Sequence, residues 1–332
     1  MKWLCAFAVI IFFSMQVSSG QLETKTVELP EGSAGIGFDD IQYSSAMKKV
    51  LVPSGRTGML NLVDPESLAV TSISGFSSAK VYKGGHGEGI TSVAEAQGML
   101  LVTDRSSLKL NVLDSDSKKI IAAVPLGSSP DYVRFIPTLN EVWVTEPDED
   151  QIEVFKMNEK QPAHSAFIKV EGGPEALVID TKKGRAYSHL WHGKTVAIDI
   201  NDKKIVATWP NGCEGSRGIS FGETPDVLLV GCSEGKAVSM DVAHDGKIIS
   251  SVTSGNGVDI IAYNHHLKHL YMPGGKSATM AIISVTADGN LKLLETVPAA
   301  EGSHCVTTDQ NDTAFVCDPK HGSLLVIKDH QK

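Results

Sequence analysis

Charged and histidine side chains recur at one position of a repeating sequence pattern. Aligned on that pattern, the position holds Asp39, Glu88 (beside Gly89), Asp131, Glu175, Arg217, Asp259 and His304. Carboxylates that converge must either protonate or find a counter-charge, which arginine, histidine, a bound cation or a cationic ligand can supply. Mixed carboxylate and imidazole donors also suit a divalent ion, with carboxylates favouring calcium or magnesium and imidazoles favouring zinc or manganese. These residues predict a ligand or metal site wherever the fold brings them together.

The repeating unit that positions these residues is clearest between Gly127 and Val170. It contains four short runs rich in Val, Ile, Phe, Tyr and Thr, at residues 132–136, 142–145, 152–155 and 166–170. Gly, Pro, Asn and Asp separate the runs, which is typical of strands joined by turns, and no helical periodicity links them. One such meander cannot bury both faces of its sheet, so it requires copies of itself.

Six further copies surround this unit. The second runs read KKVLVPSG, GMLLVTDR, NEVWVTEP, GRAYSHLW, DVLLVGCS, HLYMPGGK and TAFVCDPK. The seventh copy stops after its third run, near Lys328, and an unassigned strand-like segment, ETKTVELP, remains at residues 23–30. Pairing that segment with the last copy would close a ring and remove the open sheet edge. We therefore predict an all-β fold: a seven-bladed β-propeller of four-stranded antiparallel blades, closed by an N-terminal strand that completes the last blade.

Blade geometry places the recurring residues at the mouth of a central channel, where propeller sites are expected. The loop before each first strand and the loop after each second strand share one face. His86 lies there within GGHGEG, where glycines allow close approach to a ligand. We predict a metal site from Asp131, Glu175, Asp259 and His304. The predicted ligand-binding residues are Asp39, Glu88, Asp131, Asp259, His189, Trp191 and His192.

Alternatives to this site remain open at the level of sequence. The recurring residues are also compatible with a solvated polar rim that carries a few ion pairs. Trp191 is available to stack on a flat ligand such as a sugar ring, although a loop tryptophan also serves packing. His265 and His266 look metal-like in NHHLKH, but the repeat places them in the turn on the opposite face, so we interpret them as surface residues.

The first twenty residues are typical of a secretory signal peptide. A lysine at position 2 precedes an apolar stretch at residues 4–13, which is too short for a membrane span, and small residues follow at 18–20. Residues 1–20 are therefore predicted to be removed, leaving residues 21–332 as a single propeller domain that is secreted or periplasmic, without a transmembrane span, and monomeric. The formal charge is −9, and no Lys/Arg block is present, so nucleic acid is not an expected partner.

Cysteine spacing predicts two disulfides. Four cysteines remain once Cys5 leaves with the signal peptide. Cys213 and Cys232 flank the first hairpin of the fifth blade, and Cys305 and Cys317 do the same in the seventh. Export to an oxidising compartment favours these two pairs, with buried free thiols as the alternative.

The chain resembles the YVTN or YncE-like seven-bladed propellers. The resemblance rests on GSSPDYV with VWVTEP, EGGPEALVID with TVAIDI, and GMLLVTDR with LNVLD. The family's repeat has a proline just before the first strand, and this proline is missing from the segments that precede Arg217, Asp259 and His304. The resemblance implies the fold and export but little chemistry. Seven-bladed lactonases look similar at this level and use His, Glu and Arg at the channel mouth.

Three functions are compatible with these residues. The first is binding of a small-molecule or saccharide-like ligand, with or without a divalent metal, at the channel mouth. The second is lactonase- or lyase-type catalysis, with His304 or His86 as acid/base, Arg217 holding a carboxylate, and Glu175 beside them. The third is a protein-interaction platform that uses the rim.

Overall fold

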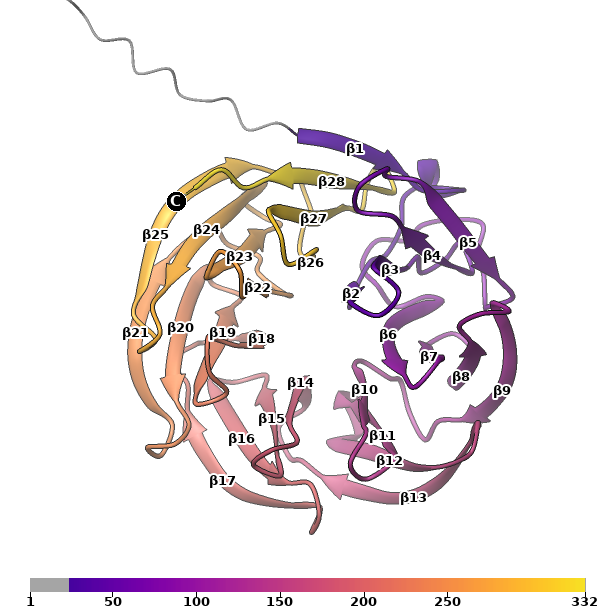
Figure 1. Cartoon of the computed structure of the whole chain (residues 1–332), viewed down its shortest axis with the longest axis horizontal. Coiled ribbons are helices and arrows are strands. Elements are labelled where there is room, and N and C mark those ends of the chain that lie inside the picture. The colour runs from indigo at the N-terminus through magenta and orange to yellow at the C-terminus, as the bar shows by residue number, and fades with distance from the viewer. Residues whose placement is uncertain (1–23, 332) are drawn as a thin grey trace, which may run out of the picture.

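The computed structural model describes residues 24–331, so the predicted signal peptide lies outside the described residues. The described chain forms 28 strands and two short 3-10 helices, and its strands make seven four-stranded antiparallel sheets arranged around a central axis (Figure 1). The predicted seven-bladed β-propeller is confirmed. None of the helices within residues 24–331 has the length and apolar character needed to cross a membrane.

The blades follow one another along the chain. The first contains β2 (Gln42–Ser44), β3 (Lys49–Pro53), β4 (Met59–Val63) and β5 (Val70–Ser74), and the second contains β6 (Ile90–Ala96), β7 (Met99–Asp104), β8 (Lys109–Asp114) and β9 (Lys119–Pro125). The third contains β10 (Val133–Ile136), β11 (Glu141–Glu146), β12 (Gln151–Asn158) and β13 (Gln161–Lys169), and the fourth contains β14 (Pro174–Asp180), β15 (Arg185–Leu190), β16 (Lys194–Asp199) and β17 (Lys204–Pro210). The fifth contains β18 (Ser216–Phe221), β19 (Val227–Cys232), β20 (Lys236–Asp241) and β21 (Lys247–Thr253), and the sixth contains β22 (Ala262–Asn264), β23 (His269–Gly274), β24 (Thr279–Val285) and β25 (Leu291–Pro298). The 3-10 helices are η1 (Gly32–Ala34) and η2 (Pro147–Glu149).

The seventh blade is built from both ends of the described chain. Its inner strands are β26 (Val306–Thr308), β27 (Thr313–Asp318) and β28 (Ser323–Lys328). Its outer strand is β1 (Thr24–Glu28), which pairs antiparallel with β28 from Thr24 opposite Ile327 to Glu28 opposite Ser323 (Figure 1). This arrangement is the predicted closure, and it leaves β28 paired on both sides rather than open to solvent.

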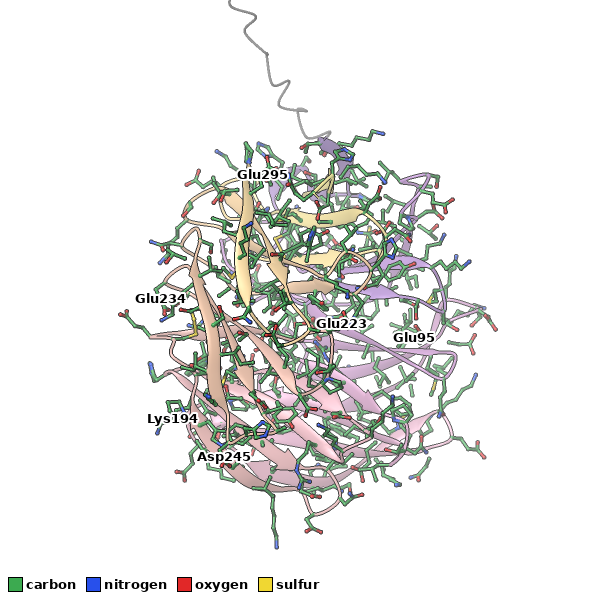
Figure 2. The ribbon with its side chains drawn as sticks, turned by 60° about the vertical axis from the view of Figure 1, so that its left-hand side comes forward. Glu95, Lys194, Glu223, Glu234, Asp245 and Glu295 are labelled. Carbon is green, nitrogen blue, oxygen red and sulfur yellow. A yellow bond between two sulfur atoms is a disulfide. The ribbon has the colours of Figure 1, made fainter. Side chains whose placement is uncertain are left out.

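Burial follows the position of each strand within its blade. Every residue of the second strand β11 is buried, whereas the outer strand β9 alternates between exposed and half-buried positions. Second strands are packed between neighbouring blades and therefore read as continuous apolar runs, while outer strands present one face to solvent. Side chains fill the spaces between the ribbons in Figure 2, and Trp143, Tyr271 and Phe38 are among the largest that are fully buried.

One strand differs from its predicted bounds. The fourth run of the third blade was expected at residues 166–170, but β13 begins at Gln161. Glu159, with a φ of 58°, and Lys160 form a tight turn after β12, so pairing starts immediately, and a register shift follows at Val154/Phe155. Polar residues at the start of β13 face solvent on an outer strand, which hides the strand from a search for apolar runs.

The two faces of the disc are distinguished by the loops that they carry. We name the face with the loops before the first strands and after the second strands the entry face, and the face with the turns between those strands the turn face. Both predicted cysteine pairs lie at the entry-face ends of their blades, with Cα–Cα distances of 5.3 Å for Cys213–Cys232 and 5.6 Å for Cys305–Cys317. These distances lie within the range that disulfides require.

Candidate functional site

A cavity of about 410 Å³ opens on the entry face at the central axis. Five successive blades contribute to it, from the second to the sixth. Its lining residues are His86, Gly87, Arg105, Ser129, Asp131, Pro147, Asp148, Glu175, Trp191, Arg217 and Asp259. Four of the recurring positions identified in the sequence therefore meet in one cavity, because the repeat places them in equivalent loops of neighbouring blades.

The floor of the entry-face cavity is an ion-pair network centred on Arg105. Its Nη2 lies 3.2 Å from Oδ2 of Asp39 and also donates to Oδ1 of Asp131. Its Nε donates to the carbonyl oxygen of Pro130 at 2.7 Å. Both carboxylates are buried, with Asp39 exposing 2% and Asp131 exposing 6% of their surfaces. The guanidinium thus joins the first and third blades beneath the cavity.

His86 is the second cation of this network. Its Nδ1 lies 2.9 Å from Oδ2 of Asp39, whose charge, opposed in part by burial, raises the pKa of His86 to about 9. Arg105 lies against the same residue, with its Nη1 2.7 Å from Nδ1 of His86 and donating to the backbone oxygen of His86 at 2.9 Å. Burial opposes the ionisation of Asp39, but the charges of His86 and Arg105 outweigh it and hold the pKa of Asp39 below its usual value.

The acids nearer to solvent behave in the opposite way. Burial, together with the charge of Asp39, raises the pKa of Asp131 well above its usual value. Burial and the charge of Asp259 raise the pKa of Glu175 to about 7, even though Arg217 lies 3.4 Å from its Oε1 and the Trp191 indole donates to its Oε2. Acid/base groups with pKa values displaced towards neutrality gather at functional sites.

Several predicted residues lie outside the cavity. Glu88 pairs with Lys83 at 3.0 Å, and His192 is exposed but does not line the cavity. His189 is fully buried, with Nδ1 2.9 Å from Thr195 Oγ1, and burial lowers its pKa to about 3, so it is a neutral core residue. The expectation that His189 is at the mouth is corrected, since the second strand β15 extends to Leu190 and carries His189 into the blade.

His304 approaches the cavity without lining it. Its ring centroid lies 5.8 Å from that of His86. Both ring nitrogens face backbone carbonyl oxygens, Nδ1 that of Gly302 at 2.6 Å and Nε2 that of Phe38 at 2.9 Å. With both nitrogens engaged by the backbone, His304 links the seventh blade to the first and offers no nitrogen to a ligand.

The predicted metal ligands are not brought together as a set. Within residues 24–331, the groups of three or more His, Cys, Asp or Glu donors that lie within 4.8 Å of one another are His304–Cys305–Cys317 and Cys213–Cys232–Glu234. Neither group contains a carboxylate of the cavity, and each includes a disulfide. The cavity carboxylates instead contact Arg105, Arg217 and His86.

Arg105, Ser129 and Asp148 line the cavity without having been predicted as site residues. The repeat does contain a signal for Arg105. This residue directly follows the second strand β7, and the loops after second strands lie at the channel mouth. Asp148 belongs to η2, which Pro147 begins, and its exposed carboxylate lies at the rim. Ser129 and Asp148 have no counterparts of the same residue type at the equivalent positions of the other blades, so an alignment of the repeats does not reveal them.

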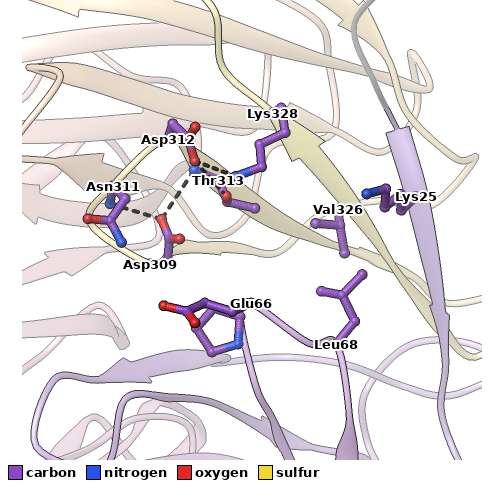
Figure 3. Close-up of a pocket in the computed structure, with 10 residues that line it drawn as sticks. Lys25, Glu66, Leu68, Asp309, Asn311, Asp312, Thr313, Val326 and Lys328 are labelled. Atoms are coloured by element: carbon purple, nitrogen blue, oxygen red, sulfur yellow. Dashed lines mark hydrogen bonds and ion pairs between the residues drawn. The ribbon is translucent and has the colours of Figure 1, made fainter.

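Two further cavities differ in character. One of about 350 Å³ lies at the turn-face end of the channel, and the residues that line it include Arg134, Ile219, Ile260, Tyr263 and His265. His265 therefore reaches the axis on the turn face, although it was expected to lie away from the channel. The other, of about 360 Å³, lies at the seam between the seventh and first blades beside β1 (Figure 3).

The seam cavity is bounded largely by groups that already bond one another. Lys328 pairs with Asp312 at 2.6 Å, and Oδ1 of Asp309 accepts the backbone N–H groups of Asn311 and Thr313, as the dashed lines in Figure 3 show. These bonds shape the turn between β26 and β27. We attribute them to the closure of the ring rather than to ligand recognition.

Comparison with known proteins shows the fold alone. No protein-family model and no curated protein sequence matches the chain. Among solved structures, a chain of the mitotic checkpoint complex is similar, with 12% identity, 99% of both chains covered and a TM-score of 0.77. A chain of Kuenenia stuttgartiensis hydrazine synthase matches with 13% identity, 96% and 100% coverage and a TM-score of 0.72. The β-propeller domain of Cps50 (Swd1) from Myceliophteria thermophila matches with 13% identity, 93% and 99% coverage and a TM-score of 0.75.

Proposed function

We propose that this protein binds a small polar, saccharide-sized ligand in the entry-face cavity. The observation that carries the proposal is the convergence of five blades on one 410 Å³ space lined by ionisable side chains and one indole. That volume lies within the range of small-ligand sites. The Arg105 network fixes the floor before any ligand arrives, and such preorganisation lowers the entropic cost of binding.

A steric variant tests whether the cavity is the binding site. Ser129 lines the cavity and is half-buried, so Ser129→Trp is expected to fill the space without removing an ionisable group. Ser45→Trp is the matched control, because Ser45 lines the turn-face cavity. A panel of small sugars, sugar acids and amines, screened by thermal shift and calorimetry, is expected to yield a ligand whose affinity falls at least tenfold in Ser129→Trp and is retained in Ser45→Trp. Unchanged binding in Ser129→Trp would contradict the proposal.

A second candidate function is acid/base catalysis in the same cavity. It is favoured by the separation of two pKa values, about 7 at Glu175 and about 9 at His86, which leaves one group able to accept and the other able to donate a proton near neutral pH. Lactone hydrolysis is the reaction class to assay. If catalysis occurs, the rate should rise as Glu175 ionises and fall as His86 loses its proton, and Glu175→Gln should abolish the lower limb. A flat profile in that variant and wild type alike would exclude this assignment.

The remaining proposals concern family and compartment. β-Propellers commonly serve as protein-interaction platforms, and one similar chain comes from a multiprotein complex. The exposed large apolar side chains of this chain, among them Phe167 on β13 and Ile248 on β21, are distributed over different blades, which favours a ligand site over a single apolar docking face. We retain YVTN-like membership, export and a monomeric state as proposals, and the two cysteine pairs support export.

A further inference from the structure

Three of the four acids in the entry-face network have a cationic partner. Asp39 pairs with His86 at 2.9 Å, Asp131 with Arg105, and Glu175 with Arg217 at 3.4 Å. Asp259 is the fourth acid of this network, and among residues 24–331 its nearest cationic atom is Nε2 of His86, at 4.0 Å.

Asp259 is also accessible from the cavity. Its side chain exposes 21% of its surface, compared with 3% for Asp39 and 8% for Asp131. No hydrogen bond from the described protein reaches its carboxylate. A ligand in this cavity therefore meets an accessible carboxylate at Asp259, and the exposed Asp148 also lines the cavity.

The displaced pKa values reflect the carboxylates around each group as well as its burial. A negative potential raises the pKa of acids and of histidine alike. The pKa values of Glu175 and Asp131 are both raised, with burial as the larger cause and a neighbouring carboxylate as the next. The pKa of His86 is raised mainly by the charge of Asp39. The pKa of Asp39 is lowered instead, because the charges of His86 and Arg105 lie directly beside its carboxylate.

Trp191 offers an aromatic surface in the same space. Its Nε1 donates to Glu175, which fixes the plane of the ring. Gly173, with a φ of 76°, lies against one side of the indole, where an added Cβ would be only 2.9 Å from Cδ2. The ring is therefore backed by main chain on one side while it contributes to the cavity lining. A positioned indole face attracts ammonium groups through its quadrupole.

These observations favour an organic cation over a metal ion. A divalent metal requires several oxygen or nitrogen donors at short distances, and among residues 24–331 no three His, Cys, Asp or Glu donors of this cavity lie within 4.8 Å of one another. An ammonium group needs one accessible carboxylate and an aromatic surface, both of which the cavity has. We propose that the ligand carries an ammonium group, bound by the carboxylate of Asp259 and the indole of Trp191. This inference rests on the proposed function, because it names the ligand class of the same cavity.

Isothermal titration calorimetry with charge-matched probes tests this inference. Choline is compared with its neutral isostere 3,3-dimethyl-1-butanol, and pentylamine with pentanol. At least one cation is expected to bind tenfold or more tightly than its isostere, with an affinity that falls as salt is raised. Asp259→Asn and Trp191→Leu should each weaken that cation at least tenfold. Asp245→Asn is the matched control, since Asp245 is an exposed acid of the turn-face loop between β20 and β21 (labelled in Figure 2).

The outcomes separate the inference from the proposed function. Equal binding of cations and isosteres, or equal loss in Asp245→Asn and Asp259→Asn, overturns the ammonium assignment. A neutral sugar that binds in wild type and is lost in Ser129→Trp, when no ammonium probe binds, overturns the ammonium assignment and leaves the cavity as the ligand site. If every ligand found binds equally well to Ser129→Trp, the proposed function fails and the inference fails with it.

Discussion

The two ends of the central channel are lined by the same first strands, yet they differ in chemistry. At the entry face, the cavity contains an accessible carboxylate, Asp259, and two acids with raised pKa values. At the turn face, the main charged group is Arg134, whose Nη1 and Nη2 bond the two oxygens of fully buried Asp40 at 2.6 Å and 3.2 Å. Ser92 and Gln42 also donate to that carboxylate. The Arg134–Asp40 pair is satisfied internally, whereas the Asp259 carboxylate at the entry face receives no hydrogen bond from the described residues.

The difference follows from the kind of loop at each end. The turns between first and second strands are short and conformationally restricted, and several place a residue at positive φ, as at Lys48, Gln97, Asn140 and Lys268. The entry-face loops connect successive blades or return from the second strand, and they vary in length and composition. Side chains there are free to serve a ligand, because the turns on the other face already fix the strands.

The largest expected effect breaks the turn-face pair. Arg134→Met leaves the buried carboxylate of Asp40 without its cation, which is expected to lower the free energy of unfolding by about 3–5 kcal/mol. Chemical denaturation measures this loss. Arg217→Met is the entry-face control, and it should cost less than about 1 kcal/mol because the ion pair of Arg217 with Glu175, at 3.4 Å, is partly exposed. Equal losses in the two variants would contradict the view that one end is structural and the other functional.

The next effect concerns the disulfides, both of which join strands at the entry face. The double variant Cys213→Ala/Cys232→Ala releases a link between residues 19 apart in sequence, and the chain-entropy treatment predicts a loss of about 3 kcal/mol or less. Denaturation with and without reductant measures it. Peptide mapping without reduction should recover Cys213–Cys232 and Cys305–Cys317 as separate linked fragments, and a fragment joining Cys232 to Cys305 would contradict the pairing.

Sequence reasoning recovered the fold because a propeller repeats its own pattern. The second strands, such as β11 and β27, are buried on both sides and therefore read as apolar runs in every blade. The missing fourth strand of the last blade pointed to the N-terminal segment, and β1 occupies that place. Outer strands were less certain, as β13 shows, because a solvent-facing strand needs no apolar run.

The site was predicted less completely, for a geometric reason. The repeat fixes which residues face the axis, so Asp131, Glu175, Arg217 and Asp259 line one cavity, and their binding role stays a prediction. It does not fix how far a strand extends, and because β15 continues to Leu190, His189 lies in the core and not at the mouth. The repeat also does not show which of these acids form ion pairs with arginine or histidine.

A smaller effect is the pH dependence of stability that Glu175 causes. The pKa of Glu175 is about 7 in the folded protein and near 4.5 in an unfolded chain, so the stability that its protonation contributes is present below pH 4.5 and is lost as the pH rises to 7. Glu175→Gln cannot ionise and should gain about 1–3 kcal/mol relative to wild type across that window. Thermal or chemical unfolding at pH 4.5, 7 and 9 measures it.

His86 provides the complementary pH window. Its pKa is raised from 6.5 to about 9, so its contribution to stability is present below pH 6.5 and is lost as the pH rises through 9. Glu175→Gln should keep this second decline, whereas His86→Gln should remove it and retain the first. A single decline that both variants remove together would mean that the two groups titrate as one unit and not as separate parts of the entry-face network.

The smallest expected effect lies at the turn face, in the double variant His265→Ala/His266→Ala. Both side chains are exposed, and the contact of the His265 ring is an edge-on one with Tyr263, at 4.9 Å between centroids. Surface changes of this kind usually alter stability by about 0.5 kcal/mol or less. The affinity for an entry-face ligand should also stay within about twofold, since both histidines belong to the turn between β22 and β23 and neither lines the entry-face cavity. Calorimetry on this variant and on Asp259→Asn decides between the two ends. If the histidine variant loses the ligand while Asp259→Asn retains it, the ligand enters from the turn face, and the functional and structural ends of the channel must be exchanged.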